Sequence, residues 1–388
     1  MKITGFRTET FNYSRGRRIG DANGVAPSDR ATASLLFIET DENITGIAMG
    51  GSPAIPQVFR VVEGQDPRST VGLWKTMADF VFKTGNEGQN FSAVSTIDAA
   101  LWDIKAKAAG EPLWRLLGAK EPRVKAYASG LDIGLSDDEL AGFYQRFADL
   151  GVDAGKLKVG LDIDADIRRL GIVRDVLSRN ARRPHLMIDS NEYWSPKQAI
   201  RYISMIEEKF DLTWAEEPAR RWDYRGLRKV SQAVRTAVAT GENINGLDEY
   251  YALVHNEAVD VVQFGSGAGI TVPLQVANFA YGYELPVSVI GSPGNPVAHA
   301  AAAMPNHIMQ EVKDFGPPPC IKIDNYLADG YIHLGNEPGF GITVDEALLA
   351  EMQKPENAGE GRFTPLTRRR GAALLVAPPQ PGEGVFGA

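Results

Sequence analysis

The sequence lacks the features that mark disulfide-rich or membrane-spanning proteins. Cys320 is the only cysteine among 388 residues, so no disulfide can form within the chain. No run of about 18 apolar residues occurs, and the opening stretch "MKITGFRTETFNY" carries no apolar segment of the kind found in secretion signals. We therefore expect a cytoplasmic protein that is not bound to a membrane.

Positive charge is also scarce. The 41 Lys and Arg residues stand against 49 Asp and Glu residues, which gives a formal net charge of −8, and basic runs are short. This balance argues against nucleic acid as a partner. Hydrophobic residues make up 44% of the chain, enough for a large core in one large domain or in two.

The first third of the sequence predicts an α+β domain over residues 1–123. The stretches "MKITGFRTETF" and "TASLLFIETDENITGIAMG" alternate apolar and polar residues, as antiparallel strands with one buried face do. The stretch "FSAVSTIDAALWDIKAKAAG" repeats apolar residues at intervals of three and four and ends in Gly110, which predicts a helix that stops there.

From residue 124 the pattern changes to short apolar strands separated by helical stretches. The strands are "KAYASG", "AGKLKVG", "HLMIDSN", "LTWAEEP", "AVATGEN", "VDVVQFG", "LPVSVIG" and "HIMQEV". About eight such βα units within some 200 residues favour an α/β fold with a closed (β/α)8 barrel over residues 124–350. Residues 351–388 are rich in Gly and Pro and predict a partly disordered tail.

Acidic residues gather at the ends of three consecutive strands. Asp189, Glu216 and Glu242 are separated by 27 and 26 positions, each about one βα unit, so their side chains should converge at the C-terminal face of the barrel. Converging carboxylates without thiol or imidazole ligands are typical of a hard-cation site, with Mg²⁺ as the best candidate and Mn²⁺ as the alternative. Glu217 is expected to point outward or toward residues behind the metal ligands.

Two lysines stand one strand earlier, in "AGKLKVG". Lys156 and Lys158 are two residues apart and therefore lie on the same face of the strand. Buried lysines close together have lowered pKa values and can act as bases, here on the α-proton of a metal-bound carboxylate. Taken alone, a Lys-x-Lys or Glu-Glu-Pro motif is more often a solvated strand face or strand end. The order and regular spacing of all the motifs favour the metal site.

The sequence resembles the enolase superfamily, in its mandelate racemase-like branch, over residues 1–350. The segments that carry the resemblance are "STIDAALWDIKAKAAGEPLWRLLGA", "KLKVG", "IDSNEYWSP", "WAEEPARRWDYRGL" and "TGENI". The resemblance implies a capping domain over a modified barrel, Mg²⁺ held by Asp189, Glu216 and Glu242, and Lys158 as acid/base. Lys156 would orient the substrate or tune its neighbour. A symmetric homo-oligomer is a further implication.

The sequence departs from that family at the next two strands. Such enzymes usually carry an Asp at the end of the sixth strand and a His at the end of the seventh. Here Gln263 or Gly265 stands at the first position, and Ile290 or Gly291 at the second. The missing dyad disfavours a racemase with a base on each face of the substrate. It favours elimination of water on one face by Lys158.

Other candidate residues complete the predicted substrate site. The resemblance aligns Glu311 with a position that binds the substrate carboxylate, and Asn191 follows the third strand. The loop 13–30 carries Arg17 and Arg18, which suit a second carboxylate or a polyhydroxylated acid, although an ordinary solvated loop weighs equally. His299 is the one imidazole that could replace the dyad, although its apolar helix favours a core role.

These observations predict a small-molecule enzyme. We expect Mg²⁺-dependent dehydration of a sugar acid or related hydroxy acid to a 2-keto product. Two alternatives stay open, an epimerase or cycloisomerase of a carboxylate and a catalytically degenerate member that only binds a carboxylate.

Overall fold

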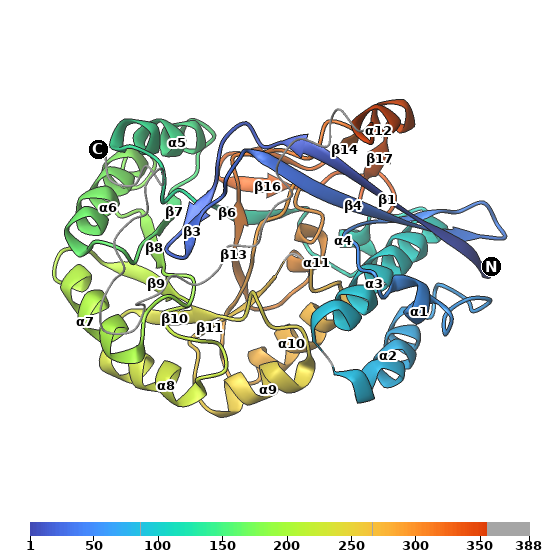
Figure 1. Ribbon diagram of the computed structural model, residues 1–388, viewed down its shortest axis with the longest axis horizontal. Coiled ribbons are helices and arrows are strands. Elements are labelled where there is room, and N and C mark those ends of the chain that lie inside the picture. Colours follow the sequence, from blue (N-terminus) through green and yellow to red (C-terminus); the bar gives the residue numbers. More distant parts are fainter. Residues whose placement is uncertain (86, 266, 355–388) are drawn as a thin grey trace.

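The computed structural model of the chain describes residues 1–85, 87–265 and 267–354 (Figure 1). Eight parallel strands form a closed barrel, because the eighth strand pairs with the first. All eight predicted strands are confirmed. They are β6 (Arg123–Ala128), β7 (Ala154–Lys158), β8 (His185–Asp189), β9 (Leu212–Glu216), β10 (Ala237–Thr240), β11 (Val261–Phe264), β12 (Val287–Val289) and β13 (His307–Val312).

A helix follows each of the first seven barrel strands and covers the outside of the barrel (Figure 1). Side-chain caps fix where several of these helices begin, as Ser136 does at the first through a capping box. The helices are α5 (Asp137–Asp149), α6 (Ile163–Leu177), α7 (Pro196–Glu207), α8 (Tyr224–Ala233), α9 (Leu247–His255), α10 (Thr271–Tyr281) and α11 (Ala298–Ala301).

The capping unit consists of a three-stranded antiparallel sheet and a group of helices. Its strands are β1 (Ile3–Ser14), β4 (Arg30–Thr40) and β5 (Gly46–Met49). Its helices are α1 (Ile55–Phe59), α2 (Thr70–Val81), the short 3-10 helix η1 (Phe82–Thr84), α3 (Gly88–Ala109) and α4 (Leu113–Leu116). The predicted stop of the long helix is confirmed, since Gly110 caps α3 in the left-handed conformation, with φ of 67°.

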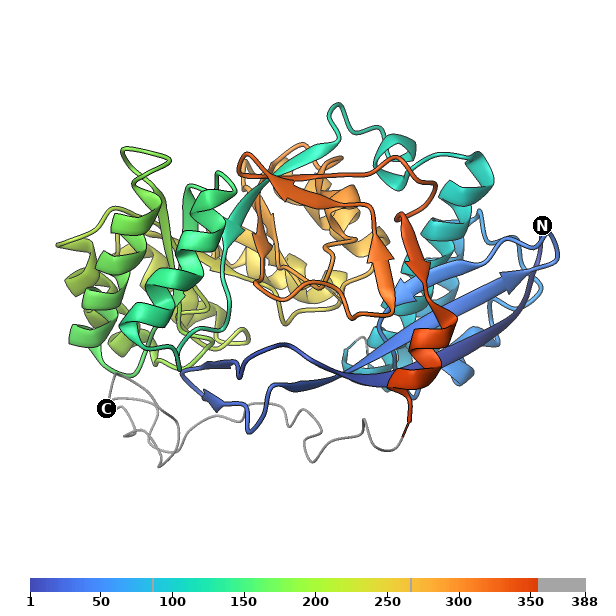
Figure 2. The same cartoon turned by 90° about the horizontal axis from the view of Figure 1, so that it is seen from above.

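Between β1 and β4 the chain makes a small hairpin of two short strands, β2 (Gly20–Asp21) and β3 (Gly24–Val25). The hairpin reaches the barrel, where the Gly20 amide donates to the Leu131 carbonyl at 2.9 Å. Figure 2 shows the ribbon of β1 and β4 running from the capping helices to this hairpin. The capping unit thus places a loop against the same end of the barrel that carries the predicted site.

After β13 the chain returns to both units. The segment contains β14 (Ile321–Ile323), β15 (Tyr326–Ala328), β16 (Tyr331–His333), β17 (Ile342–Val344) and α12 (Glu346–Met352). β16 pairs antiparallel with β6. α12 lies beside β1 (Figure 2), where Glu346 pairs with Arg7. The predicted domain boundary at residues 123 and 124 stays a prediction, and the predicted tail lies outside the described residues from 355 onward.

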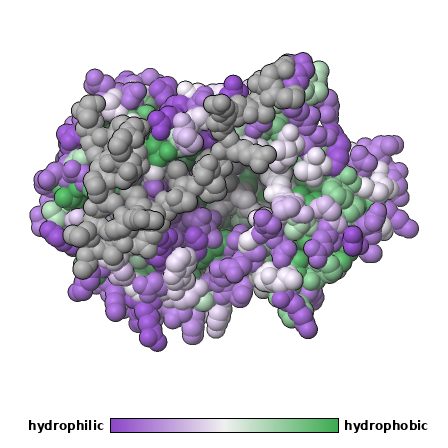
Figure 3. All heavy atoms as spheres, viewed as in Figure 1, coloured by the Kyte–Doolittle hydropathy of each residue, from purple (hydrophilic) through white to green (hydrophobic). Residues whose placement is uncertain are grey.

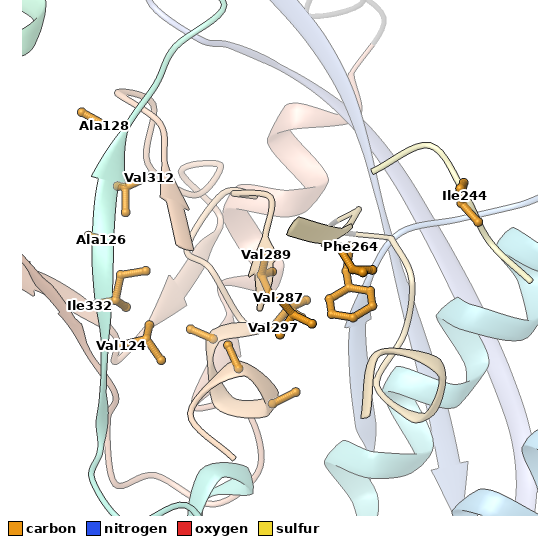
Figure 4. Close-up of a cluster of buried hydrophobic side chains, with 14 of the residues drawn as sticks. Val124, Ala126, Ala128, Ile244, Phe264, Val287, Val289, Val297, Val312 and Ile332 are labelled. Atoms are coloured by element: carbon orange, nitrogen blue, oxygen red, sulfur yellow. The ribbon is translucent and has the colours of Figure 1, made fainter. Parts of the chain in front are cut away.

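Alternation along the barrel strands divides their side chains into two sets. Ala126 and Ala128 of β6 face outward and belong to the main core, as do Val312 of β13 and Val287 and Val289 of β12 (Figure 4). The inward side chains form a separate apolar cluster inside the barrel, made of Tyr127, Ala154, Met187, Trp214, Ala239, Val261 and Met309. This cluster fills the barrel and supports the charged residues that follow on the same strands.

The molecular surface is largely polar. In Figure 3 hydrophilic residues dominate the barrel side of the molecule, and the clearest hydrophobic patches lie over the capping helices. Within the described ranges, no helix combines the length and the apolar character needed to cross a bilayer.

Candidate active site

Strand register brings the predicted charged residues to one level of the barrel. Lys158 pairs in register with Asp189, and Asp189 pairs with Glu216 on the next strand. Asp189 and Glu216 stand two residues after Met187 and Trp214, which point into the barrel. The side chains of Asp189 and Glu216 therefore also point inward. Lys156 and Asp189 are fully buried, and Lys158 is 3% exposed.

The two lysines lie directly against the carboxylates. The Lys156 ammonium pairs with Glu216, with Asp189 at 3.3 Å and with Glu311 at 3.3 Å. The Lys158 ammonium pairs with Asp189. The structure therefore brings together five of the predicted residues, from the second, third, fourth and eighth strands.

This pairing overturns the expected lowering of the lysine pKa values. Burial alone lowers the pKa of Lys156, but the Glu216 and Glu311 carboxylates outweigh it and raise the pKa well above its ordinary value. The pKa of Lys158 is raised in the same way by Asp189. Without a further cation among the carboxylates, both lysines stay protonated.

Glu217 does not point outward. It is 1% exposed, its backbone has φ of 43°, and its Oε1 accepts a hydrogen bond from Asn243 at 2.8 Å. Burial and then the carboxylates of Glu242 and Asp189 raise the pKa of Glu217 well above its ordinary value. Burial also raises the pKa of Glu242. Asp189, Glu217 and Glu242 therefore lie close enough for each carboxyl group to affect the pKa of the others.

A polar cavity of about 230 Å³ opens at this place. Its walls come from the β2–β3 hairpin and the ends of β8, β9 and β10. The lining residues are Asp21, Asn23, Asn191, Glu192, Glu217, Arg220, Arg221, Glu242 and Asn243. The buried Oδ1 of Asn191 has no hydrogen-bond partner among the described residues. An oxygen-rich wall with several neighbouring carboxyl groups and an unsatisfied amide oxygen fits a hard divalent cation.

The carboxylates do not stand in a metal-binding arrangement in this structure. Across residues 1–85, 87–265 and 267–354, no group of three or more His, Cys, Asp or Glu side chains forms such a cluster. The lysine ammonium groups lie against Asp189 and Glu216 instead. The predicted ligand set therefore stays a prediction that the donor chemistry supports.

At two of the four candidate dyad positions, Gly265 and Gly291, the backbone is packed too closely for a side chain. A Cβ atom at Gly265 would overlap the Glu242 carbonyl, and one at Gly291 would overlap the Glu311 carbonyl. Gln263 donates to Glu216 inside the barrel, and Ile290 is 6% exposed. The missing Asp and His are thus accompanied by close packing of the backbone at both positions.

His299 serves the contact between the two units. It lies on α11, is fully buried, and its Nδ1 accepts a hydrogen bond from the Trp114 amide at 3.2 Å. Burial lowers the pKa of His299 to about 4, so the ring stays neutral. Its contacts are with α4 and with Phe340, which supports the core role over that of an imidazole substitute.

The predicted arginines hold the capping loop in place. Arg17 makes two hydrogen bonds to Asp314, at 2.7 and 2.9 Å, and a third to the Gly130 carbonyl. Arg18 donates to the Ala26 carbonyl at 2.7 Å. A substrate role for either stays a prediction, and at Arg17 a ligand would have to displace Asp314.

Sequence reasoning missed the contribution of the hairpin. Asp21 is 7% exposed and lines the cavity, and the Asn23 amide donates to the Asn191 carbonyl at 2.9 Å. Burial raises the pKa of Asp21, although the Lys158 ammonium acts in the opposite direction. No periodic pattern in the loop marks these residues. Arg220 and Arg221, which pair with Glu192, lie in the segment "WAEEPARRWDYRGL". Nothing in that segment marks the two arginines as cavity residues.

Two family models match the chain. The model "Enolase C-terminal domain-like" matches residues 139–348, which is more than half of the chain. The model "Mandelate racemase / muconate lactonizing enzyme, N-terminal domain" matches residues 25–118. The chain belongs to the enolase superfamily, in its mandelate racemase-like branch. The resemblance seen in the sequence is confirmed.

Relatives of this superfamily member catalyse different reactions. The 3,6-anhydro-alpha-L-galactonate cycloisomerase of Streptomyces coelicolor is 28% identical over 362 residues, which cover 89% of this chain and 98% of the relative. The L-talarate/galactarate dehydratase of Salmonella typhimurium is 36% identical over 202 residues, which cover 52% of this chain and 50% of the relative. Enolase superfamily membership therefore leaves both lyase and isomerase activities open.

A solved structure is similar over nearly the whole fold. It is that of a racemase from Streptomyces coelicolor with bound magnesium, at 26% sequence identity and a TM-score of 0.80. The alignment covers 90% of this chain and 99% of that structure.

Proposed function

We propose that this protein is a Mg²⁺-dependent dehydratase that converts a sugar acid or related hydroxy acid into a 2-keto acid. The observation that carries the proposal is the buried Lys158 ammonium against Asp189, in a barrel where Gln263 or Gly265 and Ile290 or Gly291 stand in place of the usual dyad. One positioned base without an opposite partner suits elimination better than racemisation. The similarity to a talarate/galactarate dehydratase supports the substrate class.

Asp189, Glu216 and Glu242 are the residues that would hold Mg²⁺, with Mn²⁺ as the alternative. When bound, the cation supplies positive charge that stabilises the charge developing on the substrate carboxylate and offsets the carboxylates around the lysines. The excess of acidic groups around Glu217 and the unsatisfied Asn191 oxygen support this assignment.

The protein's own side chains divide the remaining work. Lys158 removes the α-proton, while the Lys156 ammonium holds the substrate carboxylate, and Glu311, 3.3 Å from Lys156, lies beside them and contacts the substrate. Asn191 contacts the substrate from the cavity wall. The β2–β3 hairpin covers the site and excludes water, since Asn23 bonds directly to the Asn191 backbone.

The test is a Mg²⁺-supplemented screen of mono- and diacid sugars, including L-talarate and galactarate, for 2-keto acid. We expect product with the wild type and a loss of at least about 10³-fold in Lys158→Ala. The exposed Lys197→Ala is the matched control and should keep full activity. Equal activity in Lys158→Ala would contradict the proposal.

A cycloisomerase is the second candidate, supported by the 28% identity to the 3,6-anhydro-alpha-L-galactonate cycloisomerase over 89% of this chain. It predicts a product of unchanged mass from that substrate, whereas dehydration removes one water. The third reading, a protein that only binds its ligand, predicts no exchange of the α-proton in D₂O. Mass spectrometry and proton NMR on the same samples separate all three.

A further inference from the structure

The Lys313 ammonium lies 3.4 Å from the Glu311 Oε2, and none of the roles described above uses it. Lys313 stands two residues after Glu311, one position past the end of β13 at Val312. The Lys313 side chain is 18% exposed, so it lies at the rim of the site and not in open solvent.

The Glu311 carboxylate lies between two ammonium groups. Its Oε1 is 3.3 Å from the Lys156 Nζ, and its Oε2 is 3.4 Å from the Lys313 Nζ. The same Oε2 accepts a hydrogen bond from the Gly291 amide at 3.0 Å, at the end of the seventh strand. Lys313 therefore lies on the seventh-strand side of Glu311, and Lys158 lies beyond Lys156 on the other side.

The neighbouring acid does not neutralise Lys313. Asp314 points to Arg17 at 2.7 Å and to Arg146 at 3.6 Å. Glu311 thus has an ammonium group on each side, and Lys156 and Lys313 together hold its pKa below the ordinary value against the effect of burial. A substrate carboxylate held by Lys156 would therefore have a second ammonium group, that of Lys313, on the far side of Glu311.

We propose that Lys313 is the general acid of the reaction and protonates the leaving hydroxyl group. The inference rests on the proposed dehydratase function. Lys158 takes the α-proton, and the electron pair of the broken C–H bond forms the enediolate. As the neighbouring C–O bond breaks, Lys313 gives one proton to the departing hydroxyl, which leaves as water. The resulting enol takes up a proton at the β-carbon and becomes the 2-keto acid.

The test separates proton removal from loss of water. With galactarate or L-talarate in D₂O, proton NMR follows exchange of the α-proton, and a keto-acid assay follows product. In Lys313→Met we expect exchange within about threefold of the wild type and product formation lowered by about 10²-fold or more. Lys313→Arg keeps the charge but cannot give up its proton readily, so it should not restore product.

A second readout depends on the leaving group. Fluoride departs without needing the proton that hydroxide needs, so the 3-deoxy-3-fluoro analogue of the turned-over acid should restore elimination in Lys313→Met. Lys322→Met, at an exposed lysine of β14, is the matched control and should behave as the wild type with both substrates.

Each outcome bears on a defined claim. Full product formation in Lys313→Met would overturn the acid role. Restoration of product formation by Lys313→Arg would also overturn it and would mean that the positive charge at position 313 only positions Glu311. If exchange and product fall together and fluoride gives no rescue, the acid role is also wrong. A wild type that neither exchanges nor eliminates with any acid in the screen removes the dehydratase function and this inference with it.

Discussion

At the residue scale, burial raises the pKa of several acids in this barrel. Lys156 and Lys158 sit among carboxylates, which raise their pKa values, whereas burial and then neighbouring carboxylates raise the pKa of Glu217. Asp166 is another buried acid with a raised pKa, and it lies away from the proposed metal ligands. It is 1% exposed, its Oδ2 accepts from the Gly160 amide at 2.8 Å, and its Oδ1 has no partner among the described residues.

Asp166 should make stability depend on pH. Burial raises its pKa from 3.8 to about 8, against the smaller opposing effects of the Gly160 amide and Arg169. The folded protein then holds a proton that the unfolded chain releases, so this contribution is complete below pH 3.8 and is lost as pH rises to about 8. Asp166→Asn should remove a decline of up to about 1.4 kcal/mol per pH unit across this window.

Urea unfolding at about pH 5.5 and about pH 7.5 measures the effect. Asp164→Asn, at an exposed position of the same helix, is the control and should keep the wild-type slope. An unchanged slope in Asp166→Asn would show that the carboxyl group is ionised in the folded protein.

At the element scale, the ends of the sixth and seventh strands are defined by close backbone packing. Gly265 lies against the Glu242 carbonyl and Gly291 against the Glu311 carbonyl, and the Gly291 amide also bonds to the Glu311 side chain. A single substitution therefore cannot restore a histidine at position 291.

Gly291→Ala should be destabilising. Its Cβ would overlap a backbone carbonyl, and overpacking of this kind costs about 1–3 kcal/mol. Gly142→Ala is the matched control, because a Cβ there meets nothing within 4 Å and the site lies in α5, where alanine is the better helix former. Urea midpoints should fall in the first variant and rise or stay constant in the second. A stable Gly291→Ala protein would mean that the strand end can shift.

At the scale of the whole molecule, two units build one site. The capping unit supplies the hairpin with Asp21 and Asn23, and the barrel supplies the lysines and carboxylates. Arg17 fastens the loop to Asp314, while His299 joins α11 to α4. Because these contacts span the two units, ligand binding at the barrel mouth should stabilise the assembly as a whole.

Mg²⁺ should raise the thermal stability of the wild type. At a Mg²⁺ concentration of about 100 times the dissociation constant, binding to the folded state alone contributes about 2.7 kcal/mol. Glu242→Gln, which lies at the cavity wall, should weaken the effect, whereas the exposed Glu63→Gln should not. Melting curves with and without Mg²⁺ measure this without any substrate. Equal shifts in wild type and Glu242→Gln would place the cation elsewhere.

The sequence by itself determined the barrel fold and the position of the site at the C-terminal ends of the barrel strands. Short apolar runs separated by helical stretches identified all eight barrel strands, because strands of a parallel barrel are buried on both faces. Regular spacing of Asp189, Glu216 and Glu242 placed them at strand ends. Lys313 could also be placed near the site from the sequence, since it follows Glu311 by two residues, one position past the end of β13.

Only the tertiary structure decided what these residues contact. Glu217 proved buried, Arg17 proved bound to Asp314, and Asp21 arrived from a hairpin more than 100 residues away from Lys158 in the chain. The pKa values of Lys156 and Lys158 rose where the sequence predicted a fall. Periodicity records which face of an element is buried, whereas a charge state and an ion pair depend on neighbours that the fold brings from distant segments.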